Sequence, residues 1–403
     1  MDLFKLNIRI LTILLLFLLS SCTTTTIQTN HPIKNTANLS VADRTYTQLQ
    51  QAIPMYQEAV LHPWMVLPSN VKLKPGVKNM YVIALRGRLE ATGELKPEND
   101  TRMTLYDDSV TEAIKRFQFS HGLEPTGAVG PKTLAELNIS PTERLQQIQV
   151  NMRRWAKLSH ELGDRYILVN VPDYRLQVVE NGEVVLSMKA IVGKPERPTP
   201  ELSSKITRIV FNPYWNVPNT IAEEDIVPKV ISDPNYLDDM HIEILSQQTD
   251  DATVLNSNDI DWQSMELNGF PYHFRQEPGS DNALGLVKFE FDNSHDVYLH
   301  DTPAKNLFEL TKRDFSSGCI RLEKPFELAN YLMKDDPDWT EDKMQDILDT
   351  GKTRYIKAST PTEIIIAYLT AWTDESGNVQ FRDDIYSEDN LLLMSNEEDV
   401  NSL

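Results

Sequence analysis

A histidine and a cysteine in the stretch YLHDTPAKNLFELTKRDFSSGCIRL, residues 298–322, are the side chains of this sequence best suited to catalysis. His300 is followed by 15 residues and then by Ser316-Ser317-Gly318-Cys319. A thiol is mostly protonated near neutral pH, so a cysteine nucleophile needs an imidazole, either as a base or as the partner of a thiolate. Gly318 lets backbone N–H groups approach a reacting carbonyl, where they could form an oxyanion hole. On spacing alone, however, an inert buried cysteine is the commoner case.

The N-terminus decides how the two cysteines of the chain are interpreted. Lys5 and Arg9 accompany an apolar run, Ile10 to Leu19, that is shorter than the roughly 20 residues of a membrane-spanning helix. The run ends in Leu19-Ser20-Ser21-Cys22, which resembles a bacterial lipobox. We therefore expect residues 1–22 to be a lipoprotein signal peptide whose lipidated residue is Cys22. An ordinary secretory peptide with an incidental cysteine is the alternative.

This interpretation leaves Cys319 as a lone thiol in an oxidising compartment, where two cysteines would ordinarily suggest one disulfide. Such a thiol is a liability unless it is buried or used. Thr23, in place of an aspartate after Cys22, resembles lipoproteins that are sent to the outer membrane. We therefore expect a periplasmic protein that is lipid-anchored to the outer membrane.

The overall charge of the chain argues against a nucleic-acid partner. The 403 residues include 39 Lys and Arg and 59 Asp and Glu, a formal net charge of −20, and no long basic block offsets it. Phosphate binding needs a local positive surface, so the acidity indicates solubility rather than a binding site. The 8 histidines are scattered without ligand spacing, so neither a metal nor another cofactor is expected.

Short strands must position the histidine and the cysteine, because apolar residues alternate with a period of two from Tyr166 onward. Asn181-Gly182 is the stronger of two hairpin signals in this region, and Asp173-Tyr174 is the other. Many short strands with few helices predict a mainly β catalytic module. The predicted strands cover residues 167–171, 175–179, 184–188, 206–211, 287–291, 297–300 and 364–372, and helices are expected at 326–333 and after residue 340.

The strand predicted over Val297–His300 points Tyr298 and His300 to the same face of a sheet, because alternate residues of a strand share a face. Cys319 follows a Ser-Ser-Gly turn and is expected to precede a helix.

Residues 76–140 are predicted to form a small helical module upstream of the strands. Asp108 can cap a helix whose apolar residues at 110, 114 and 117 share one face, and Pro131 suits the first position of a second helix. The string SVTEAIKRFQFSHGLEPTGAVGPKTLAELN resembles the three-helix peptidoglycan-binding domain, with its Phe-Gln pair, its Gly-Leu and its Thr-Gly-x-Val-Gly-x-x-Thr turn. A helical scaffold without a ligand is the alternative, because no individual binding residue can be identified.

The remaining segments complete the domain plan. Residues 23–75 are interpreted as a linker and an N-terminal scaffold piece, 141–163 as a helical connector with Trp155 in its apolar stripe, and 164–382 as the catalytic domain. Within that domain, an acidic, Asp/Asn-rich segment of about 221–275 far exceeds an ordinary connection, so it is predicted to be a lid or capping insert. Residues 383–403 are interpreted as an acidic tail that is surface-exposed or disordered.

The spacing of His300 and Cys319 resembles that of the L,D-transpeptidases, whose motif places a histidine at this distance before Ser/Thr-His-Gly-Cys. Most members have a second histidine where this chain has Ser317, but the large branch tolerates serine, and the histidine that does the chemistry is matched by His300. Arg321 stands where Asn is frequent. The strings RYILVNVPDYRLQVVENGEVVLSMKAIVGKPERPTP, FNPYWNVP, PGSDNALGLVKF and LTAWTDESGNVQFRDDIY also look like the large branch, so the similarity covers roughly 75–385.

The resemblance implies a multidomain α+β protein, in which a small helical peptidoglycan-binding domain precedes a mainly β catalytic domain with a capping insert. Cys319 would attack the carbonyl between meso-diaminopimelate and D-alanine in a stem tetrapeptide. His300 would deprotonate it, held by the backbone carbonyl of Asp301, with the Asp301 carboxylate as the alternative. The Cys319 amide, in the turn shaped by Gly318, would stabilise the oxyanion, and the amine of a second stem would convert the thioester into a 3→3 cross-link. The candidate substrate-binding residues are Tyr298, Arg321, Trp215 and Ser317, with packing or a structural ion pair as the other possibility.

Rival functions stay open at this point. An L,D-carboxypeptidase or another hydrolase would form the same acyl-enzyme, since only the acceptor differs. FNPYWNVP and the insert favour a polymer-sized donor and hence the transferase. A papain-type peptidase has its cysteine before its histidine, and a non-catalytic wall-binding lipoprotein is disfavoured because His300 and Cys319 are both present. The expected partners are peptidoglycan stem peptides and, through a lipid on Cys22, a membrane; cell-wall synthase partners cannot be identified. The family also reacts with carbapenems.

Overall fold

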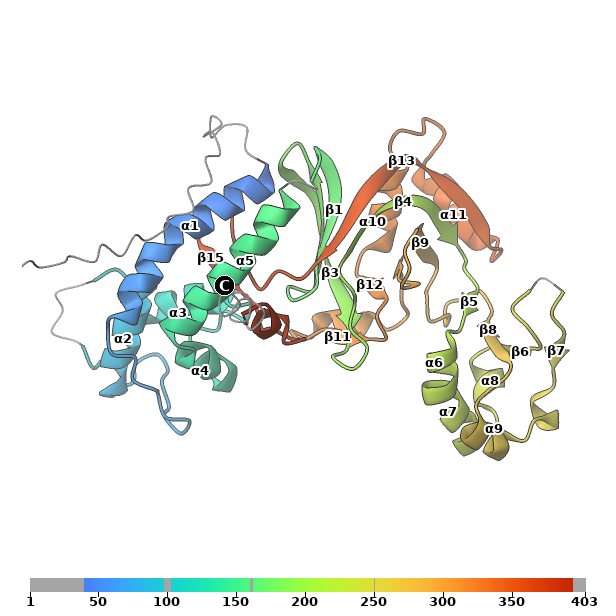
Figure 1. Ribbon diagram of the computed structural model, residues 1–403, viewed down its shortest axis with the longest axis horizontal. Helices are drawn as coiled ribbons and strands as arrows, with labels where there is room; N and C mark the ends of the chain where they lie inside the picture. Colours follow the sequence, from blue (N-terminus) through green and yellow to red (C-terminus); the bar gives the residue numbers. More distant parts are fainter. Residues whose placement is uncertain (1–39, 98–102, 160–161, 250, 394–403) are drawn as a thin grey trace, which may run out of the picture. The chain divides into compact units, whose positions relative to one another are not determined.

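The computed structural model describes residues 40–97, 103–159, 162–249 and 251–393. The expected signal peptide, its Cys22 and the start of the linker lie outside these residues. Helices dominate the described chain up to residue 158 and strands dominate from residue 165 onward (Figure 1), in agreement with the change of apolar period in the sequence. None of the described helices is long and apolar enough to cross a membrane.

Three helices form the predicted helical module: α2 (Tyr81–Ala91), α3 (Asp108–Ser120) and α4 (Pro131–Asn138). The side chain of Asp107 caps α3 by accepting the N–H of Val110, so the predicted cap, Asp108, is wrong by one residue. Pro131 stands in the first turn of α4 as predicted, where its missing N–H costs no hydrogen bond. The apolar faces of these helices share a core that includes Leu85, Ile114 and Leu134.

Two further helices, α1 (Val41–Val60) and α5 (Pro141–Leu158), pack along each other and against one face of the sheet. Ser140 and Glu143 form a capping box at the start of α5. Trp155 is buried with Tyr166 and Ile365, so its predicted place in the apolar stripe of the helix is confirmed.

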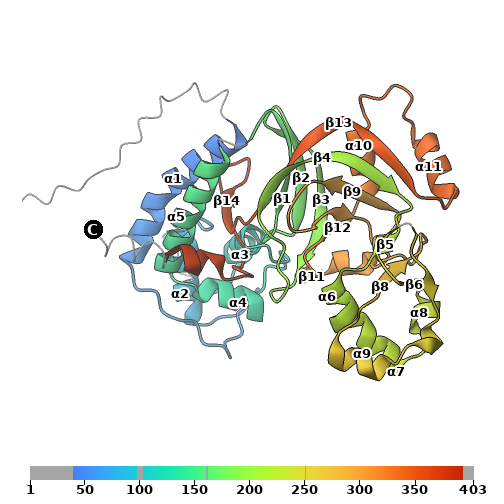
Figure 2. The same ribbon diagram turned by 45° about the vertical axis from the view of Figure 1, so that its right-hand side comes forward.

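In the described chain nine strands form one sheet, in the order β11-β3-β12-β10-β9-β4-β13-β1-β2. Strand β2 also pairs with β3, so the sheet closes on itself like a barrel (Figure 2). The bounds are β1 (Arg165–Asn170), β2 (Arg175–Glu180), β3 (Glu183–Gly193), β4 (Leu202–Phe211), β9 (Val287–Phe291), β10 (Leu299–His300), β11 (Asp314–Ser316), β12 (Ile320–Leu322) and β13 (Arg354–Ala367).

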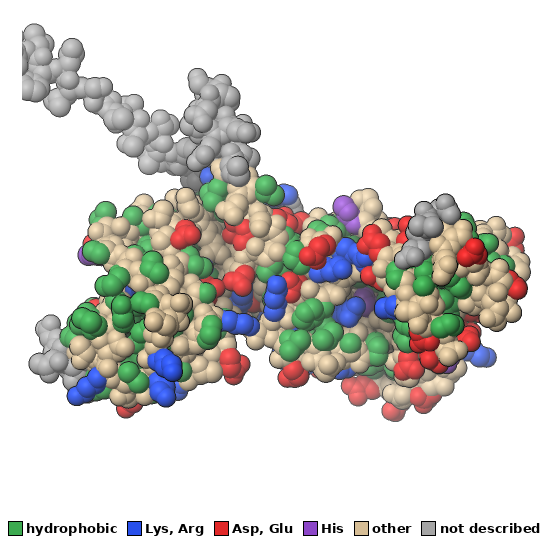
Figure 3. Space-filling model, turned by 90° about the horizontal axis from the view of Figure 1, so that it is seen from below, with side chains coloured by type: hydrophobic (Ala, Val, Ile, Leu, Met, Phe, Trp, Pro, Cys, Tyr) green, Lys and Arg blue, Asp and Glu red, His purple; other side chains and the backbone are tan. Residues whose placement is uncertain are grey.

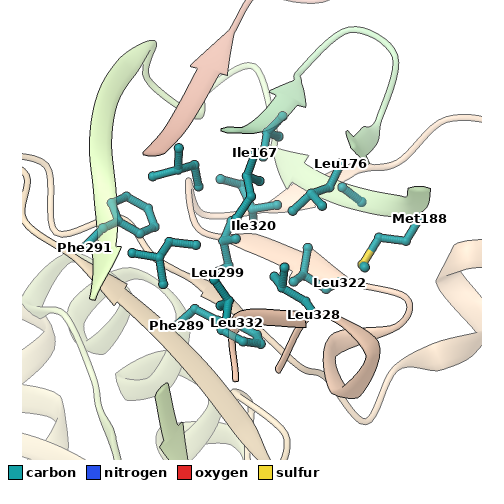
Figure 4. Packing of buried hydrophobic residues seen from close by; sticks show 14 of the residues in the cluster. Ile167, Leu176, Met188, Phe289, Phe291, Leu299, Ile320, Leu322, Leu328 and Leu332 are labelled. Atoms are coloured by element: carbon teal, nitrogen blue, oxygen red, sulfur yellow. The ribbon is translucent and has the colours of Figure 1, made fainter. Parts of the chain in front are cut away.

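The interior of this sheet holds the main core, in which side chains from distant strands meet (Figure 4). Helix α10 (Pro325–Leu332) contributes Leu328 and Leu332 to it, and α11 (Glu341–Asp349) starts at the cap Thr340, so both predicted helices are confirmed. The Asn181-Gly182 hairpin is confirmed as well, with φ values of 52° and 82° that suit these two residues.

Several predicted strands differ from the observed ones, two of them greatly. Strand β3 is far longer than predicted, because its second half pairs with β12 and β11, which come from more than 100 residues later in the chain. The predicted strand 364–372 is interrupted: β13 ends at Ala367, and β14 (Ala371–Thr373) pairs with β15 (Val379–Phe381) instead. Between them, the N–H groups of Leu369 and Thr370 are taken by side chains of β1 and α5 rather than by a strand.

The predicted insert is a folded unit with its own core, which includes Val217, Ile226, Leu237, Phe270 and Phe274. It begins at Trp215 and ends at Gln276, slightly outside the predicted range. Its sheet has the order β5 (Trp215–Asn216), β8 (His273–Gln276), β6 (Ile242–Leu245), β7 (Val254–Leu255). Its helices are α6 (Asn219–Ile221), the π-helical turn η2 (Ala222–Ile226), α7 (Val227–Ser232), α8 (Tyr236–Asp239), the short turn η3 (Ser257–Asp259) and α9 (Trp262–Asn268).

The first part of the predicted acidic tail, residues 383–393, packs against the catalytic domain. Tyr386 stacks on Tyr368 with ring centroids 5.5 Å apart, and Asp389 is buried in an ion pair with Arg154. Residues 394–403 lie outside the described part of the chain. Acidic and basic side chains are interspersed over the face drawn in Figure 3, so the negative net charge does not gather into one acidic patch on that face.

Candidate active site

Strand pairing brings the histidine and the cysteine to one face of the sheet. Strand β10 pairs with β12 in parallel, with Leu299 opposite Ile320 and His300 opposite Arg321. The N–H of Ile320 donates to the carbonyl of Tyr298 at 3.1 Å, so Cys319 lies beside Tyr298. Because directly paired residues of parallel strands share a face and the faces alternate, Tyr298, His300, Cys319 and Arg321 all point to the face opposite Leu299 and Ile320.

This arrangement confirms that Tyr298 and His300 share a face, and their ring centroids are 5.7 Å apart. Two local predictions are wrong. Only Leu299–His300 of the predicted strand 297–300 is a strand, and Cys319 is followed first by strand β12 and only then by a helix. The short strand β12 exists because β3 and β10 pair with it from either side, which the local sequence does not indicate.

The imidazole of His300 is buried and is oriented by a main-chain group. Its Nδ1 lies 2.5 Å from the carbonyl oxygen of Asp301, so Nδ1 carries the proton and Nε2 is left as the acceptor. The Asp301 carboxylate instead accepts the N–H of Leu286 at 2.9 Å and pairs with Lys305. Of the two alternatives for Asp301, the backbone carbonyl is therefore the one that faces His300. Gly285 makes room for the Asp301 carboxylate in this position, because a Cβ on residue 285 would lie 2.3 Å from it.

The protonation states of the pair favour a neutral thiol and a neutral imidazole. Burial, with the positive charges of Arg321, Lys288 and Lys305 nearby, lowers the pKa of His300 to about 3. Burial also raises the pKa of the Cys319 thiol above its ordinary value, and hydrogen bonds from Tyr298 offset this only in part. A thiolate–imidazolium pair needs the opposite order of pKa values, so the resting pair is a neutral thiol and a neutral imidazole, whose Nε2 is free to accept a proton.

Tyr298 lies beside Cys319, and Trp215 lies beside Tyr298. Burial raises the pKa of Tyr298 well above its usual value, and its hydroxyl has hydrogen-bonding partners in Cys319 and in Trp215 of strand β5. The ammonium of Lys288 lies 4.0 Å from the Tyr298 ring centroid. The sulfur of Cys319 is partly exposed and lies 3.9 Å from the carbonyl oxygen of Asp296. Of the two aromatic residues predicted to line the cleft, Tyr298 thus contacts the thiol and Trp215 contacts Tyr298.

Arg321 presents a cation to the same face. Arg321 is partly buried, and this burial lowers its pKa. The positive charge of Arg321 in turn lowers the pKa of His300. Within the described residues its Nε has no hydrogen-bond partner. The alternative of a structural ion pair therefore has no support here, and the guanidinium is available for an anionic group.

The turn before Cys319 has a conformation that requires glycine. Gly318 has a φ of +112°, which L side chains rarely adopt, and its N–H donates to the hydroxyl of Ser316 at 3.2 Å. Among the described residues, no acceptor takes the N–H of Cys319. That N–H is therefore free to bind an oxyanion.

Ser317 connects the catalytic turn to the insert rather than facing the thiol. Its exposed hydroxyl accepts a hydrogen bond from Arg197 at 2.9 Å, and Arg197 pairs with Glu224 and Asp225 of the π-helical turn η2. Arg197 was not identified as a functional residue from the sequence, because it occurred there only within the string KPERPTP, at the end of a longer string quoted for the family resemblance.

A groove of about 570 Å³ extends from Tyr298 across the sheet. Arg208 pairs in register with Glu290 on one side and with Lys357 on the other. Lys288, two residues before Glu290 in the same strand, pairs in register with His300. One sheet face therefore continues from Lys357 to His300. Arg208 and Glu290 also form an ion pair. The charged residues that line this groove are Arg208, Lys288, Glu290, Asp292, Asp296 and Lys357.

No group of three or more His, Cys, Asp or Glu side chains that could hold a metal ion occurs in the described part of the chain.

Two family models match the chain. Residues 164–347 match the "L,D-transpeptidase catalytic domain", and residues 81–137 match the "Putative peptidoglycan binding domain". A Haemophilus influenzae protein described as "Putative L,D-transpeptidase" is 40% identical over 303 residues, which cover 74% of this chain. The chain spans 60% of the length of that relative.

Several solved structures are similar at low identity. An L,D-transpeptidase from Mycobacterium smegmatis is 15% identical, with 51% of this chain and 58% of that chain covered and a TM-score of 0.22. One from Xylanimonas cellulosilytica is 14% identical, with 75% and 100% covered and a TM-score of 0.23. One from Stackebrandtia nassauensis is 12% identical, with 76% and 97% covered and a TM-score of 0.26.

Proposed function

Because this chain carries an L,D-transpeptidase catalytic domain behind a peptidoglycan-binding-type domain, we propose that it forms 3→3 cross-links in peptidoglycan through a thioester on Cys319. The observation that carries this proposal is the single sheet face on which β10 and β12 bring together Cys319, His300 and Arg321. A nucleophile, a base and a cation for a substrate carboxylate are the groups that acyl transfer from a stem peptide needs.

In the first half-reaction the sulfur of Cys319 attacks the carbonyl between diaminopimelate and D-alanine, and the thiol proton passes to Nε2 of His300. The Cys319 N–H, which has no acceptor among the described residues, donates to the oxyanion. When the C–N bond breaks, His300 returns the proton to the amine of D-alanine, which leaves. The pKa of His300, which is lowered to about 3, keeps the imidazole neutral at rest, so its Nε2 is unprotonated and can take the thiol proton as the C–S bond forms.

In the second half-reaction the amine of a second stem attacks the thioester, gives its proton to His300 and releases Cys319 as a thiol. The carbon of diaminopimelate that carries the attacking amine also carries a carboxylate. In the groove that extends from Tyr298, Arg208 and Glu290 pair with each other, while Asp292 supplies a carboxylate and Lys357 an ammonium group, which matches such a zwitterion. We assign this groove to the acceptor stem.

The test is incubation of the purified protein with disaccharide-tetrapeptide, with the products analysed by mass spectrometry. Dimers with a 3→3 link support the transpeptidase, whereas tripeptide without dimer supports an L,D-carboxypeptidase that uses water as the acceptor. Cys319→Ala should abolish both products, and activity retained by that variant would rule out the nucleophile. Covalent addition of a carbapenem to the wild type and not to Cys319→Ala provides an independent measure of acylation.

For the location of the protein we infer a periplasmic lipoprotein that is anchored to the outer membrane through Cys22. The support is the sequence Leu19-Ser20-Ser21-Cys22 followed by Thr23. A Cys22→Ser variant should remain unprocessed or become soluble. Unchanged membrane association of that variant would contradict lipidation, and fractionation of the two membranes tests the outer-membrane assignment.

A further inference from the structure

A buried threonine hydroxyl connects two glycines at the catalytic turn. Thr199 is 2% exposed. Its Oγ1 accepts the N–H of Gly193 at 2.8 Å and donates to the carbonyl of Gly318 at 2.7 Å. A hydroxyl has one proton to donate, so the contact with Gly193 leaves that proton directed at Gly318.

The carbonyl that Thr199 holds belongs to the same peptide group as the N–H of the nucleophile. The carbonyl of Gly318 and the N–H of Cys319 lie in one plane and, in a trans peptide, point in opposite directions. Fixing the oxygen of Gly318 therefore fixes the direction of the Cys319 N–H. Without such a hold, Gly318 at a φ of +112° has many alternative conformations, because glycine lacks a Cβ.

The next peptide group is held from the other side. The hydroxyl of Ser316 accepts the N–H of Gly318 and donates to the carbonyl of Cys319. Two side-chain hydroxyls thus hold the carbonyls on either side of the nucleophile, while the N–H between those carbonyls is left without an acceptor in the described part of the chain.

Thr199 is itself held by the segment that the sequence suggests to be a tail. The hydroxyl of Tyr386 donates to the carbonyl of Gly193 and accepts the N–H of Thr199 at 3.3 Å. The N–H of Tyr386 donates to the hydroxyl of Tyr368 at 2.8 Å. The loop from 193 to 199 closes tightly, since a Cβ on Gly193 would lie 2.2 Å from the carbonyl oxygen of Arg197.

We propose that Thr199 is a positioning residue for the oxyanion hole, which aims the Cys319 N–H by holding the Gly318 carbonyl, and that Tyr386 holds Thr199 in place. Neither side chain touches substrate. The inference rests on the proposed acyl-transfer function, and it gives residues 383–393 a part in catalysis that their composition does not suggest.

The test compares Thr199→Val, Thr199→Ser and Tyr386→Phe in the full chain, with two reagents for Cys319. A carbapenem forms an oxyanion during acylation, whereas iodoacetamide alkylates the thiol at a saturated carbon and forms none. Acylation by Thr199→Val should fall by roughly 100-fold, the lower end of the loss caused by removing one oxyanion donor, with alkylation within about twofold of wild type. Thr199→Ser keeps the hydroxyl and should restore acylation, and Tyr386→Phe should reduce acylation by about fivefold with alkylation unchanged.

Three results would overturn the inference: wild-type acylation by Thr199→Val, a parallel loss of acylation and alkylation, or no rescue by Thr199→Ser. If thermal melting shows that Thr199→Val does not fold, Tyr386→Phe decides, since equal effects on both reagents or on neither would contradict the proposal. A wild-type protein that neither acylates nor cross-links would instead refute the proposed function itself.

Discussion

Asp301 supports His300 with its main chain and not with its carboxylate: His300 Nδ1 lies 2.5 Å from the Asp301 carbonyl oxygen, while the carboxylate binds the N–H of Leu286 and pairs with Lys305. The imidazole is thus oriented by an uncharged group. The charges that act most on its pKa among the described residues are those of Arg321, Lys288 and Lys305, which lower it, in agreement with a value of about 3 for this buried residue.

The first prediction concerns Asp301→Asn. In this variant the main-chain carbonyl is unchanged, and the side-chain amide oxygen can still accept the N–H of Leu286. We therefore expect carbapenem acylation to fall by less than about tenfold. The equivalent change in a triad whose histidine is supported by a carboxylate costs roughly 10⁴-fold. Asp301→Ala is the matched variant, which leaves that buried N–H unsatisfied and should cost about 1–3 kcal/mol of stability. A folded Asp301→Asn protein with a thousand-fold loss of activity would contradict orientation by the carbonyl.

The second prediction is a dependence of stability on pH that comes from His300. Its folded-state pKa of about 3 lies below its ordinary value, so the unfolded chain binds more protons than the native one between about pH 6.5 and 3. The contribution is fully present above about pH 6.5 and is lost as the pH falls toward 3. Urea unfolding of wild type and His300→Gln across this range measures it: the variant should lose less stability on acidification, and parallel pH dependences would refute the prediction.

The third prediction concerns Arg321, a partly buried cation whose Nε has no hydrogen-bond partner among the described residues. Arg321→Met keeps the length but removes the charge, and it should lower kcat/KM for the tetrapeptide by about 10- to 100-fold, as expected for loss of a charged hydrogen bond to a substrate carboxylate. It should also raise the pKa of His300, since the Arg321 charge lowers it. Arg321→Lys should recover part of the loss, whereas unaltered KM and kcat in Arg321→Met would remove Arg321 from the binding site.

The fourth prediction separates donor from acceptor through Lys357, which lies in the groove on the far side of Lys288 and Arg208. Lys357→Glu should shift the products from dimer toward tripeptide, by about tenfold in their ratio, because the acceptor carboxylate then meets a like charge. Acylation by a carbapenem should not change, and Lys357→Arg is the charge-preserving control. An equal loss of dimer and tripeptide would place the donor stem, not the acceptor, in this groove.

The sequence by itself was sufficient for the features that depend on local chemistry or on short spacing. Turn residues such as Asn181-Gly182 and Pro131 predicted their turns and helix starts, because their backbone preferences act within a few residues. The alternation in Val297–His300 placed Tyr298 and His300 on one face, and the Ser-Ser-Gly turn marked Cys319. The choice of His300 and Cys319 as the candidate catalytic pair came from a motif and not from any derived contact.

Only the tertiary structure decided which groups surround that pair. Strand β12 follows Cys319 because β3 and β10 pair with it, and the tail at Tyr386 holds the loop at Thr199, 187 residues away in the chain. Whether the carbonyl or the carboxylate of Asp301 faces His300 depends on Gly285 and Leu286, which no local pattern links to it. These contacts join residues that are distant in sequence, and only the folded chain brings their hydrogen-bonding groups within reach.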